Sequence, residues 1–88
     1  MDIVLKDEAI QDKAFWKKSG NKRIIKKIDD LVDDIILHPE TGIGKPEQLK
    51  HELTGFWSRH INDKHRIVYK VMNDELHIIS LRGHYYDK

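Results

Sequence analysis

The clearest pattern in the chain is the spacing of Ile, Leu and Val between residues 24 and 36. These residues recur every three or four positions, so they form one face of a predicted α-helix, while Lys and Asp occupy the other face. Asn21 can cap its start, and Pro39 follows its end. A first helix is predicted over about 7–18, with Ser19-Gly20 suited to its termination. The apolar positions expected on or near one face of that first helix are Ile10, Ala14 and Phe15.

Strand patterns occur at both ends of the chain. Ile3-Val4-Leu5 indicates a short first strand, and the Gly- and Pro-rich segment 39–50 indicates a loop. Apolar segments at 55–61, 65–71 and 76–81 are separated by turn residues, which predicts two hairpins in series. The expected order is strand, helix, helix and three strands. This order predicts an α+β fold in which two N-terminal helices pack on one face of an antiparallel sheet and the other face is left for a ligand.

Strand alternation predicts which face of the sheet each residue of 65–71 occupies. Ile67, Tyr69 and Val71 share one face, and Arg66, with Val68 and Lys70, shares the other. If the apolar trio packs under the helices, Arg66 faces the side that the helices leave open.

Length and composition limit the classes of protein that the chain can belong to. Eighty-eight residues suffice for one domain, expected to span 1–88. Charged residues make up 35% and hydrophobic ones 39%, as in a globular protein, and no apolar run is long enough to cross a membrane. We therefore expect a cytoplasmic protein without membrane contact. The absence of cysteine excludes disulfides, a thiol nucleophile and a thiolate metal site.

Charge is distributed unevenly along the chain. Residues 1–40 carry eight Lys or Arg against nine Asp or Glu, whereas residues 41–88 carry eight against six and five of the six histidines lie beyond residue 50. A weakly basic half suits a polyanion. The excess is too small to hold nucleic acid by electrostatics alone, so an RNA contact would be local or delivered by a partner that already holds the RNA.

Three side chains offer the groups needed to cut RNA without a metal. Glu47 provides a carboxylate, Arg66 a guanidinium and His84 an imidazole with an ordinary pKa of about 6.5. Such cleavage requires a base for the ribose 2′-hydroxyl, a positive charge on the phosphate and an acid for the 5′-oxygen. Residue type alone also allows a solvated Glu, a cross-strand Arg and a frayed terminal His.

Two other functional interpretations are disfavoured. Gly42-x-Gly44-Lys45 lacks the full spacing and the preceding strand of a phosphate-binding loop. The histidines match no zinc motif, so no metal site is expected from His51, His60, His65 and His77.

Several sequence blocks resemble the YoeB/Txe toxins of the bacterial RelE superfamily, which are ribosome-dependent messenger RNA endonucleases. The resemblance covers nearly the whole chain and implies an antiparallel sheet with two helices on one face, an RNA-cutting site on the concave side and a masking antitoxin of YefM type. The chain departs from the family at His60, where a second Arg is common, at Gly83, where an aromatic residue is usual, and in continuing past Tyr85. The matching blocks are 21–24, 44–51, 55–59, 65–69 and 84–85.

The resemblance also implies a role for each candidate residue. Glu47 would be the general base, Arg66 would stabilise the phosphate and His84 would be the general acid, giving a 2′,3′-cyclic phosphate and a free 5′-hydroxyl without a cofactor. Tyr85 would orient or stack on the substrate. The candidates for backbone phosphate contacts are Lys45, Lys50 and, more weakly, Arg59.

Two alternatives to ribosome-dependent cleavage remain open at this point. One is a relative that binds the ribosome or an antitoxin without cutting, as a transcriptional co-repressor. The other is an RNase that cuts naked RNA. Whether the chain forms a homodimer is also left open.

Overall fold

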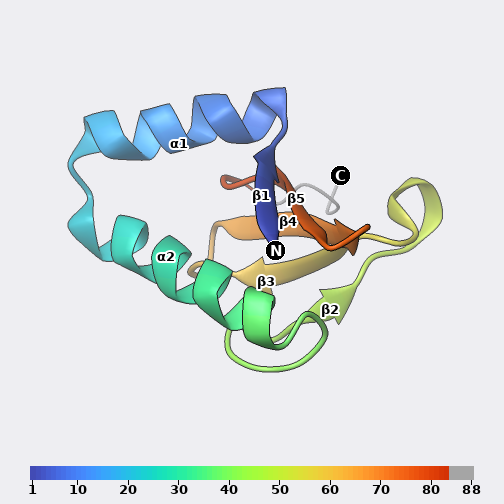
Figure 1. Ribbon diagram of the computed structural model, residues 1–88. Coiled ribbons are helices and arrows are strands. Elements are labelled where there is room, and N and C mark those ends of the chain that lie inside the picture. The colour runs from blue at the N-terminus through green and yellow to red at the C-terminus, as the bar shows by residue number, and fades with distance from the viewer. Residues whose placement is uncertain (84–88) are drawn as a thin grey trace.

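In the computed structural model, which describes residues 1–83, two helices lie against a five-stranded sheet (Figure 1). Both helices contribute to a single apolar core on one face of that sheet. The elements in chain order are β1 (Asp2–Leu5), α1 (Asp7–Ser19), α2 (Lys22–Leu37), β2 (Glu47–Gln48), the short 3₁₀-helix η1 (His51–Leu53), β3 (Trp57–His60), β4 (Arg66–Met72) and β5 (Glu75–Ser80).

Local signals in the sequence set the ends of the two helices as predicted. The Ile24 amide donates to Asn21 Oδ1 at 3.2 Å, which caps the start of α2. Gly20, with φ of 70°, takes the left-handed conformation that ends α1. The apolar face of α2 is buried at Ile24, Leu31 and Ile35.

The apolar face expected for α1, with Ile10, Ala14 and Phe15, is not the face that the helix buries. Ala9, Asp12 and Trp16 are the buried residues of this helix, whereas Ile10 and Phe15 are 52% and 46% exposed. Ala9 is small and Asp12 is polar, so these positions give no strong hydrophobic periodicity from which the face could be predicted. The docking of α1 on the sheet selects the face, and the Trp16 indole is the large apolar group that it buries.

The sheet has the strand order β1-β5-β4-β3-β2. The predicted α+β class is confirmed, but the sheet is mixed because β1 pairs with β5 in parallel while the other pairs are antiparallel. A parallel pair needs a crossover between its strands, and here the crossover contains both helices and the other strands. The segment expected to be a loop at 39–50 contains the edge strand β2.

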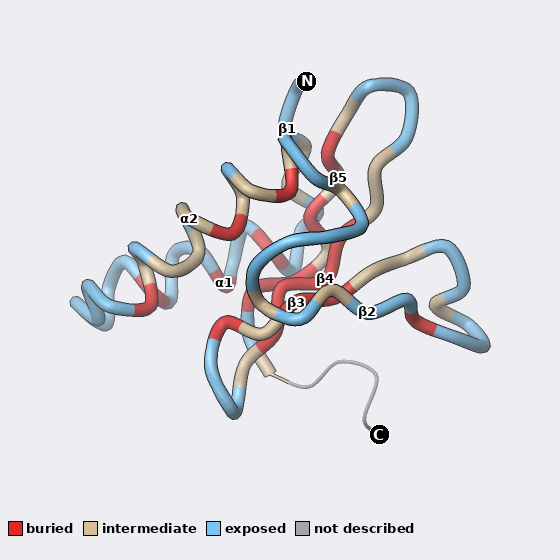
Figure 2. Tube along the Cα trace, turned by 90° about the horizontal axis from the view of Figure 1, so that it is seen from below, coloured by how far each residue is buried: buried red, intermediate tan, exposed pale blue. Residues whose placement is uncertain are grey.

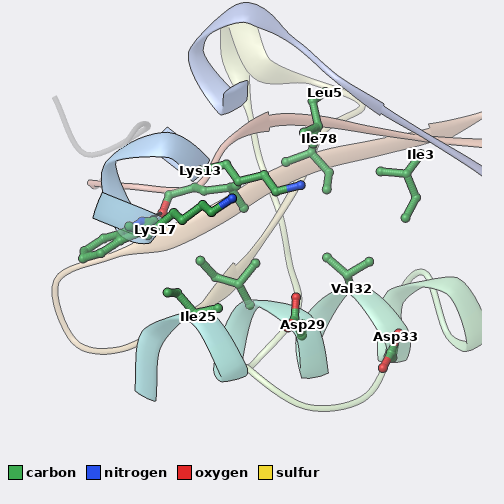
Figure 3. A pocket seen from close by; sticks show the side chains of 12 residues that line it. Ile3, Leu5, Lys13, Lys17, Ile25, Asp29, Val32, Asp33 and Ile78 are labelled. Carbon is green, nitrogen blue, oxygen red and sulfur yellow. Dashed lines mark hydrogen bonds between the residues drawn. The ribbon is translucent and has the colours of Figure 1, made fainter. Parts of the chain in front are cut away.

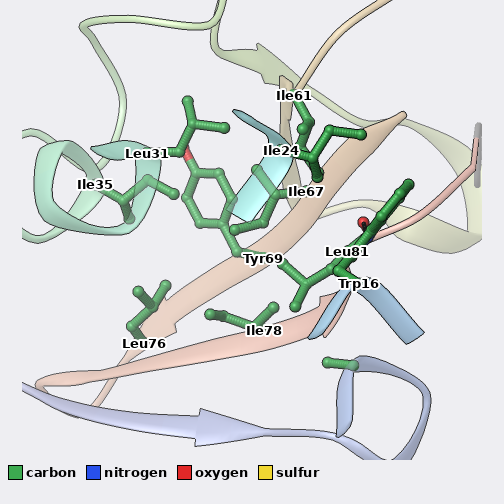
Figure 4. Close-up of a cluster of buried hydrophobic side chains, with 11 residues drawn as sticks. Trp16, Ile24, Leu31, Ile35, Ile61, Ile67, Tyr69, Leu76, Ile78 and Leu81 are labelled. Atoms are coloured by element: carbon green, nitrogen blue, oxygen red, sulfur yellow. Dashed lines mark hydrogen bonds between the residues drawn. The ribbon is translucent and has the colours of Figure 1, made fainter. Parts of the chain in front are cut away.

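The predicted alternation along β4 is confirmed by its packing. Ile67 and Tyr69 belong to the core on the helix side, and Val71 packs against it. Arg66 and Val68 therefore lie on the opposite face of the sheet, which we call the outer face. Figure 2 shows buried positions along the central strands of the sheet. The core side chains labelled in Figure 4 are Trp16, Ile24, Leu31, Ile35, Ile61, Ile67, Tyr69, Leu76, Ile78 and Leu81.

A register shift between β4 and β5 changes which side chains reach the outer face. Tyr69 pairs with Ile78, but its neighbour Val68 pairs with Ser80, so β5 contains one extra residue. Such a bulge reverses the alternation of the strand beyond it. Ser80 consequently shares the outer face with Val68, although strict alternation would have placed it with Ile78.

Candidate functional site

A row of paired residues crosses the outer face through four strands. Glu47 of β2 pairs with Ser58 of β3, Ser58 with Val68 of β4, and Val68 with Ser80 of β5. Residues that face each other on neighbouring strands share a face of the sheet, so the Glu47 carboxylate starts this row at one edge.

Arg66 lies one pair further along the same face, opposite His60. Two strand spacings separate Glu47 from Arg66, or about 10 Å, and two residues along the strand add about 7 Å. Glu47 is exposed, whereas Arg66 is buried and its guanidinium is held at the turn between β3 and β4. The sheet thus places two of the three predicted catalytic groups on one face.

The guanidinium of Arg66 is anchored on one side. Its Nη1 donates to the carbonyl oxygens of the turn between β3 and β4, at 3.0 Å to Asn62, 3.4 Å to Asp63 and 3.3 Å to His65. Arg66 is only 7% exposed, and its buried Nε has no hydrogen-bond partner among residues 1–83. A buried donor without an acceptor is costly, and a guanidinium edge suits an anionic oxygen. The geometry therefore favours an anion beside Arg66.

The pKa of His60 responds to several charged residues of this face. Burial, together with the positive charges of Arg66 and Lys45, lowers the pKa of His60 from its ordinary value of 6.5, while Glu47 and Asp63 oppose the shift. One imidazole thus lies within electrostatic reach of both Glu47 and Arg66. Sequence reasoning noted His60 only as a departure from the family pattern and as one of four histidines from which no metal site was expected. The alternation of Trp57-Ser58-Arg59-His60, which places His60 and Ser58 on one face, was the signal that could have found it.

Two serine hydroxyls are buried beside Val68 on the same face. Ser58 and Ser80 are fully buried, and in the part of the chain that the structure describes neither Oγ has a hydrogen-bond partner. Sequence reasoning missed both. Ser58 could have been placed by alternation along β3, but the bulge that brings Ser80 to this face leaves no mark in the sequence.

Arg59 is fully buried, which corrects the expectation that it contacts a phosphate. It pairs with Ile67 in the register of the sheet, so its side chain lies on the helix side. Nε donates to the Tyr69 hydroxyl at 3.1 Å and Nη1 to Asp34 Oδ2 at 2.5 Å. Burial raises the pKa of Tyr69 above 10.0, although the hydrogen bond from Arg59 acts to lower it. The carbonyl oxygens that bind the remaining donors belong to His38, Thr41 and Ile43.

The two candidate lysines lie on the surface near Glu47. Lys45 and Lys50 are exposed, and the charge of Lys45 acts on His60. Lys50 follows Leu49, which is buried and donates its amide to Phe56 O at 2.9 Å. Both lysines therefore stay available for phosphate contacts. His84 and Tyr85 lie outside the described residues.

Close packing, not phosphate binding, accounts for the glycines before Lys45. Gly44 has φ of 80°, and its carbonyl accepts the His60 amide at 2.7 Å. A Cβ on Gly44 would lie 2.7 Å from Leu31 Cδ2, and one on Gly42 would lie 2.0 Å from Asp34 Oδ2. These contacts hold the segment before Glu47 against α2 and β3.

A separate groove runs between α1, α2 and the β1 side of the sheet (Figure 3). Its volume is about 750 Å³, and its walls are mainly apolar, with Lys13 and Lys17 on α1 and Asp29 and Asp33 on α2. None of Glu47, His60 and Arg66 lines it. The groove is therefore distinct from the outer face.

Two further properties follow from residues 1–83. No group of three or more His, Asp or Glu side chains in this range is arranged to hold a metal ion. Neither of its α-helices has the length and apolar character needed to span a bilayer.

The same fold occurs in solved structures of bacterial toxins. A YoeB/ParE toxin from Agrobacterium tumefaciens superimposes with a TM-score of 0.92 at 38% identity, covering 97% of this chain and 100% of the other. A chain of the YoeB–YefM complex from Staphylococcus aureus gives a TM-score of 0.88 at 40% identity, covering 97% and 98%. These matches define a small toxin with a RelE-like fold.

Sequence comparison identifies the family. The family described as YoeB-like toxin of bacterial type II toxin-antitoxin system matches residues 5–85. Toxin YoeB of Escherichia coli strain K12 is 46% identical over 85 residues, which is 97% of this chain and 100% of that protein. Toxin YoeB of Streptomyces coelicolor is 44% identical with the same coverage. The chain belongs to the YoeB-like toxin family.

Proposed function

We propose that the chain is an endoribonuclease that cuts messenger RNA in the ribosomal A site and thereby inhibits translation. The observation that supports this most directly is the anchored guanidinium of Arg66, whose buried Nε lacks a partner among the described residues. It lies on the face that also bears Glu47, as the geometry of a phosphate flanked by a base requires.

In the proposed reaction Glu47 removes the proton of the 2′-hydroxyl, and the 2′-oxygen forms a bond to the neighbouring phosphorus. Arg66 stabilises the charge that gathers on the phosphate oxygens. The bond to the 5′-oxygen breaks, and that oxygen takes a proton from His84. Tyr85 orients or stacks on the nucleotide. The products are a 2′,3′-cyclic phosphate and a 5′-hydroxyl, and these steps need no metal or cofactor.

The ribosome accounts for the modest charge of the chain. A message already held in the A site is delivered in position, so the protein need not bind RNA by electrostatics alone. Lys45 and Lys50 would add local contacts to backbone phosphates beside Glu47. This proposal places the activity in the cytoplasm, where messages are translated.

We also propose a YefM-like antitoxin as the partner that restrains the activity. The solved structures similar to this chain include a YoeB–YefM complex and a YoeB dimer, both from Staphylococcus aureus. By analogy the chain would bind a small antitoxin, and a homodimer is a second proposed assembly.

Programmed ribosomes carrying a defined message test the proposal. Wild-type protein should cut the message in the A-site codon, and Glu47→Ala and Arg66→Ala should cut it at least 100-fold more slowly while remaining folded. Intact message together with tight ribosome binding would contradict cleavage and support the non-cleaving alternative. Equally fast cleavage of naked RNA would contradict dependence on the ribosome.

A further inference from the structure

The chain is held at four backbone groups after it leaves β5. The Leu81 amide donates to Asp12 Oδ2 at 2.9 Å, and Trp16 Nε1 donates to Leu81 O at 2.8 Å. Two residues later the Gly83 amide donates to His65 Nδ1 at 2.9 Å, and the Arg66 amide donates to Gly83 O at 3.1 Å. Both polar groups of the Leu81 and Gly83 backbones are thus bound.

The side chains that hold this segment form one continuous group, which we call the exit clamp: Asp12, Trp16 and His65. Asp12 and Trp16 come from the buried face of α1 and are 5% and 6% exposed. The His65 ring meets the Trp16 ring edge to face, with centroids 4.9 Å apart. A carboxylate is costly to bury without hydrogen bonds, and Asp12 receives one from Leu81.

The conformation of Gly83 fits this arrangement. Its φ of 82° lies in the left-handed region that residues with a Cβ rarely adopt, although a Cβ there would have open space around it. Glycine at this position therefore permits the left-handed backbone conformation. It allows the Gly83 peptide groups to reach His65 and the Arg66 amide together.

Gly83 is held against Arg66, and it directly precedes His84 in the sequence. We propose that Asp12, Trp16 and His65 are positioning residues, which fix the point from which His84 reaches the phosphate bound by Arg66. This inference rests on the proposed function. It assigns to α1, which lies on the opposite side of the sheet from Glu47, a part in protonating the leaving group.

Substrates that differ at one atom test the clamp. One message carries the natural 5′-oxygen at the scissile bond, and the other carries sulfur there. A thiol ionises at about pH 8.5, whereas an alcohol keeps its proton to a much higher pH. The sulfur can therefore leave without taking a proton from an acid. His65→Leu should slow cleavage of the oxygen message roughly 10- to 100-fold and leave cleavage of the sulfur message near wild type.

Three further variants complete the cleavage test. His84→Gln should likewise cut the oxygen message slowly and the sulfur message at a rate near wild type, because it removes the proposed acid itself. His65→Asn keeps an acceptor oxygen near the Nδ1 position and should restore most of the oxygen cleavage. His38→Asn, on an exposed histidine after α2, should behave as wild type.

If His65→Leu slows cleavage of both messages equally, while His84→Gln still cuts the sulfur message at a rate near wild type, the clamp is overturned. The proposed function would still stand. Wild-type protein that cuts neither message would contradict the proposed function. Hydrogen exchange tests the clamp without cleavage, because the Gly83 amide should exchange at least 10-fold faster in His65→Leu than in wild type. Equal exchange rates would overturn the clamp whatever the cleavage result.

Discussion

Arg59 Nη1 lies 2.5 Å from Asp34 Oδ2, and this contact joins the last turn of α2 to β3. The same guanidinium binds the Tyr69 hydroxyl and three carbonyl oxygens of the segment after α2. Arg59 therefore fixes the path of the chain between α2 and Glu47. It supports the candidate site from beneath the sheet.

Replacing Arg59 by Met should lower the free energy of unfolding by about 3 kcal/mol or more, because buried carbonyl oxygens lose their donors. Urea denaturation measures this change. Lys26→Ala is the matched control, since it removes an ion pair with Asp30 on the exposed face of α2 and should change stability by less than about 0.5 kcal/mol. A similar loss in both variants would contradict a central role for Arg59.

The Asp34 carboxylate should make folding sensitive to acid. The hydrogen bond from Arg59 lowers the pKa of Asp34 below 3.8, so the folded state favours the charged form. Its contribution to stability is present above pH 3.8 and is lost as the pH falls through the folded-state value. Denaturation from pH 7 to pH 2.5 should therefore show wild type more stable than Asp34→Asn at neutral pH, with the gap closing in acid. A gap that stays constant would contradict the shift.

The sequence predicted those parts of the fold that rest on strong local patterns. The seven apolar positions between residues 24 and 36 follow helical spacing, and Asn21 caps the helix as expected. Alternation along β4 placed Arg66 on the outer face, because the apolar residues Ile67, Tyr69 and Val71 must face the core. The family blocks then supplied Glu47, whose loop-like sequence concealed the two-residue strand β2.

What could not be predicted depends on long-range pairing. The parallel pairing of β1 with β5 and the bulge that turns Ser80 outward involve partners more than 10 residues apart. Arg59 was misassigned because a cationic residue beside a predicted site was taken to be exposed, whereas β3 turns it into the interior. Only the tertiary partners Asp34 and Tyr69 reveal why a guanidinium is buried there.

Replacing Ser58 and Ser80 tests whether their buried hydroxyls lack hydrogen-bond partners. Ser58→Ala and Ser80→Ala should leave the free energy of unfolding unchanged or raise it by about 1 kcal/mol, because neither hydroxyl loses a partner within the described residues. Ser19→Ala should instead lower it by about 0.5 to 1 kcal/mol, since Ser19 Oγ donates to Trp16 O at 2.7 Å. Clear destabilisation by the first two variants, measured by urea, would show that their hydroxyls are paired.

NMR titration of His60 tests the assembly of the outer face without RNA. The wild-type imidazole should titrate below pH 6.5, because burial and Arg66 disfavour its charged form. Glu47→Gln should lower the pKa of His60 further, and Arg66→Gln should raise it, since each variant removes the charge that shifts it. A His60 pKa that neither variant changes would show that these side chains do not meet.

The chemical nature of the RNA ends tests the central claim most directly. Mass spectrometry of a message cut on programmed ribosomes should show a 2′,3′-cyclic phosphate upstream and a 5′-hydroxyl downstream, and both products should be lost with Glu47→Gln. A 3′-hydroxyl with a 5′-phosphate, or cyclic product that persists in Glu47→Gln, would contradict the proposed acid–base cleavage.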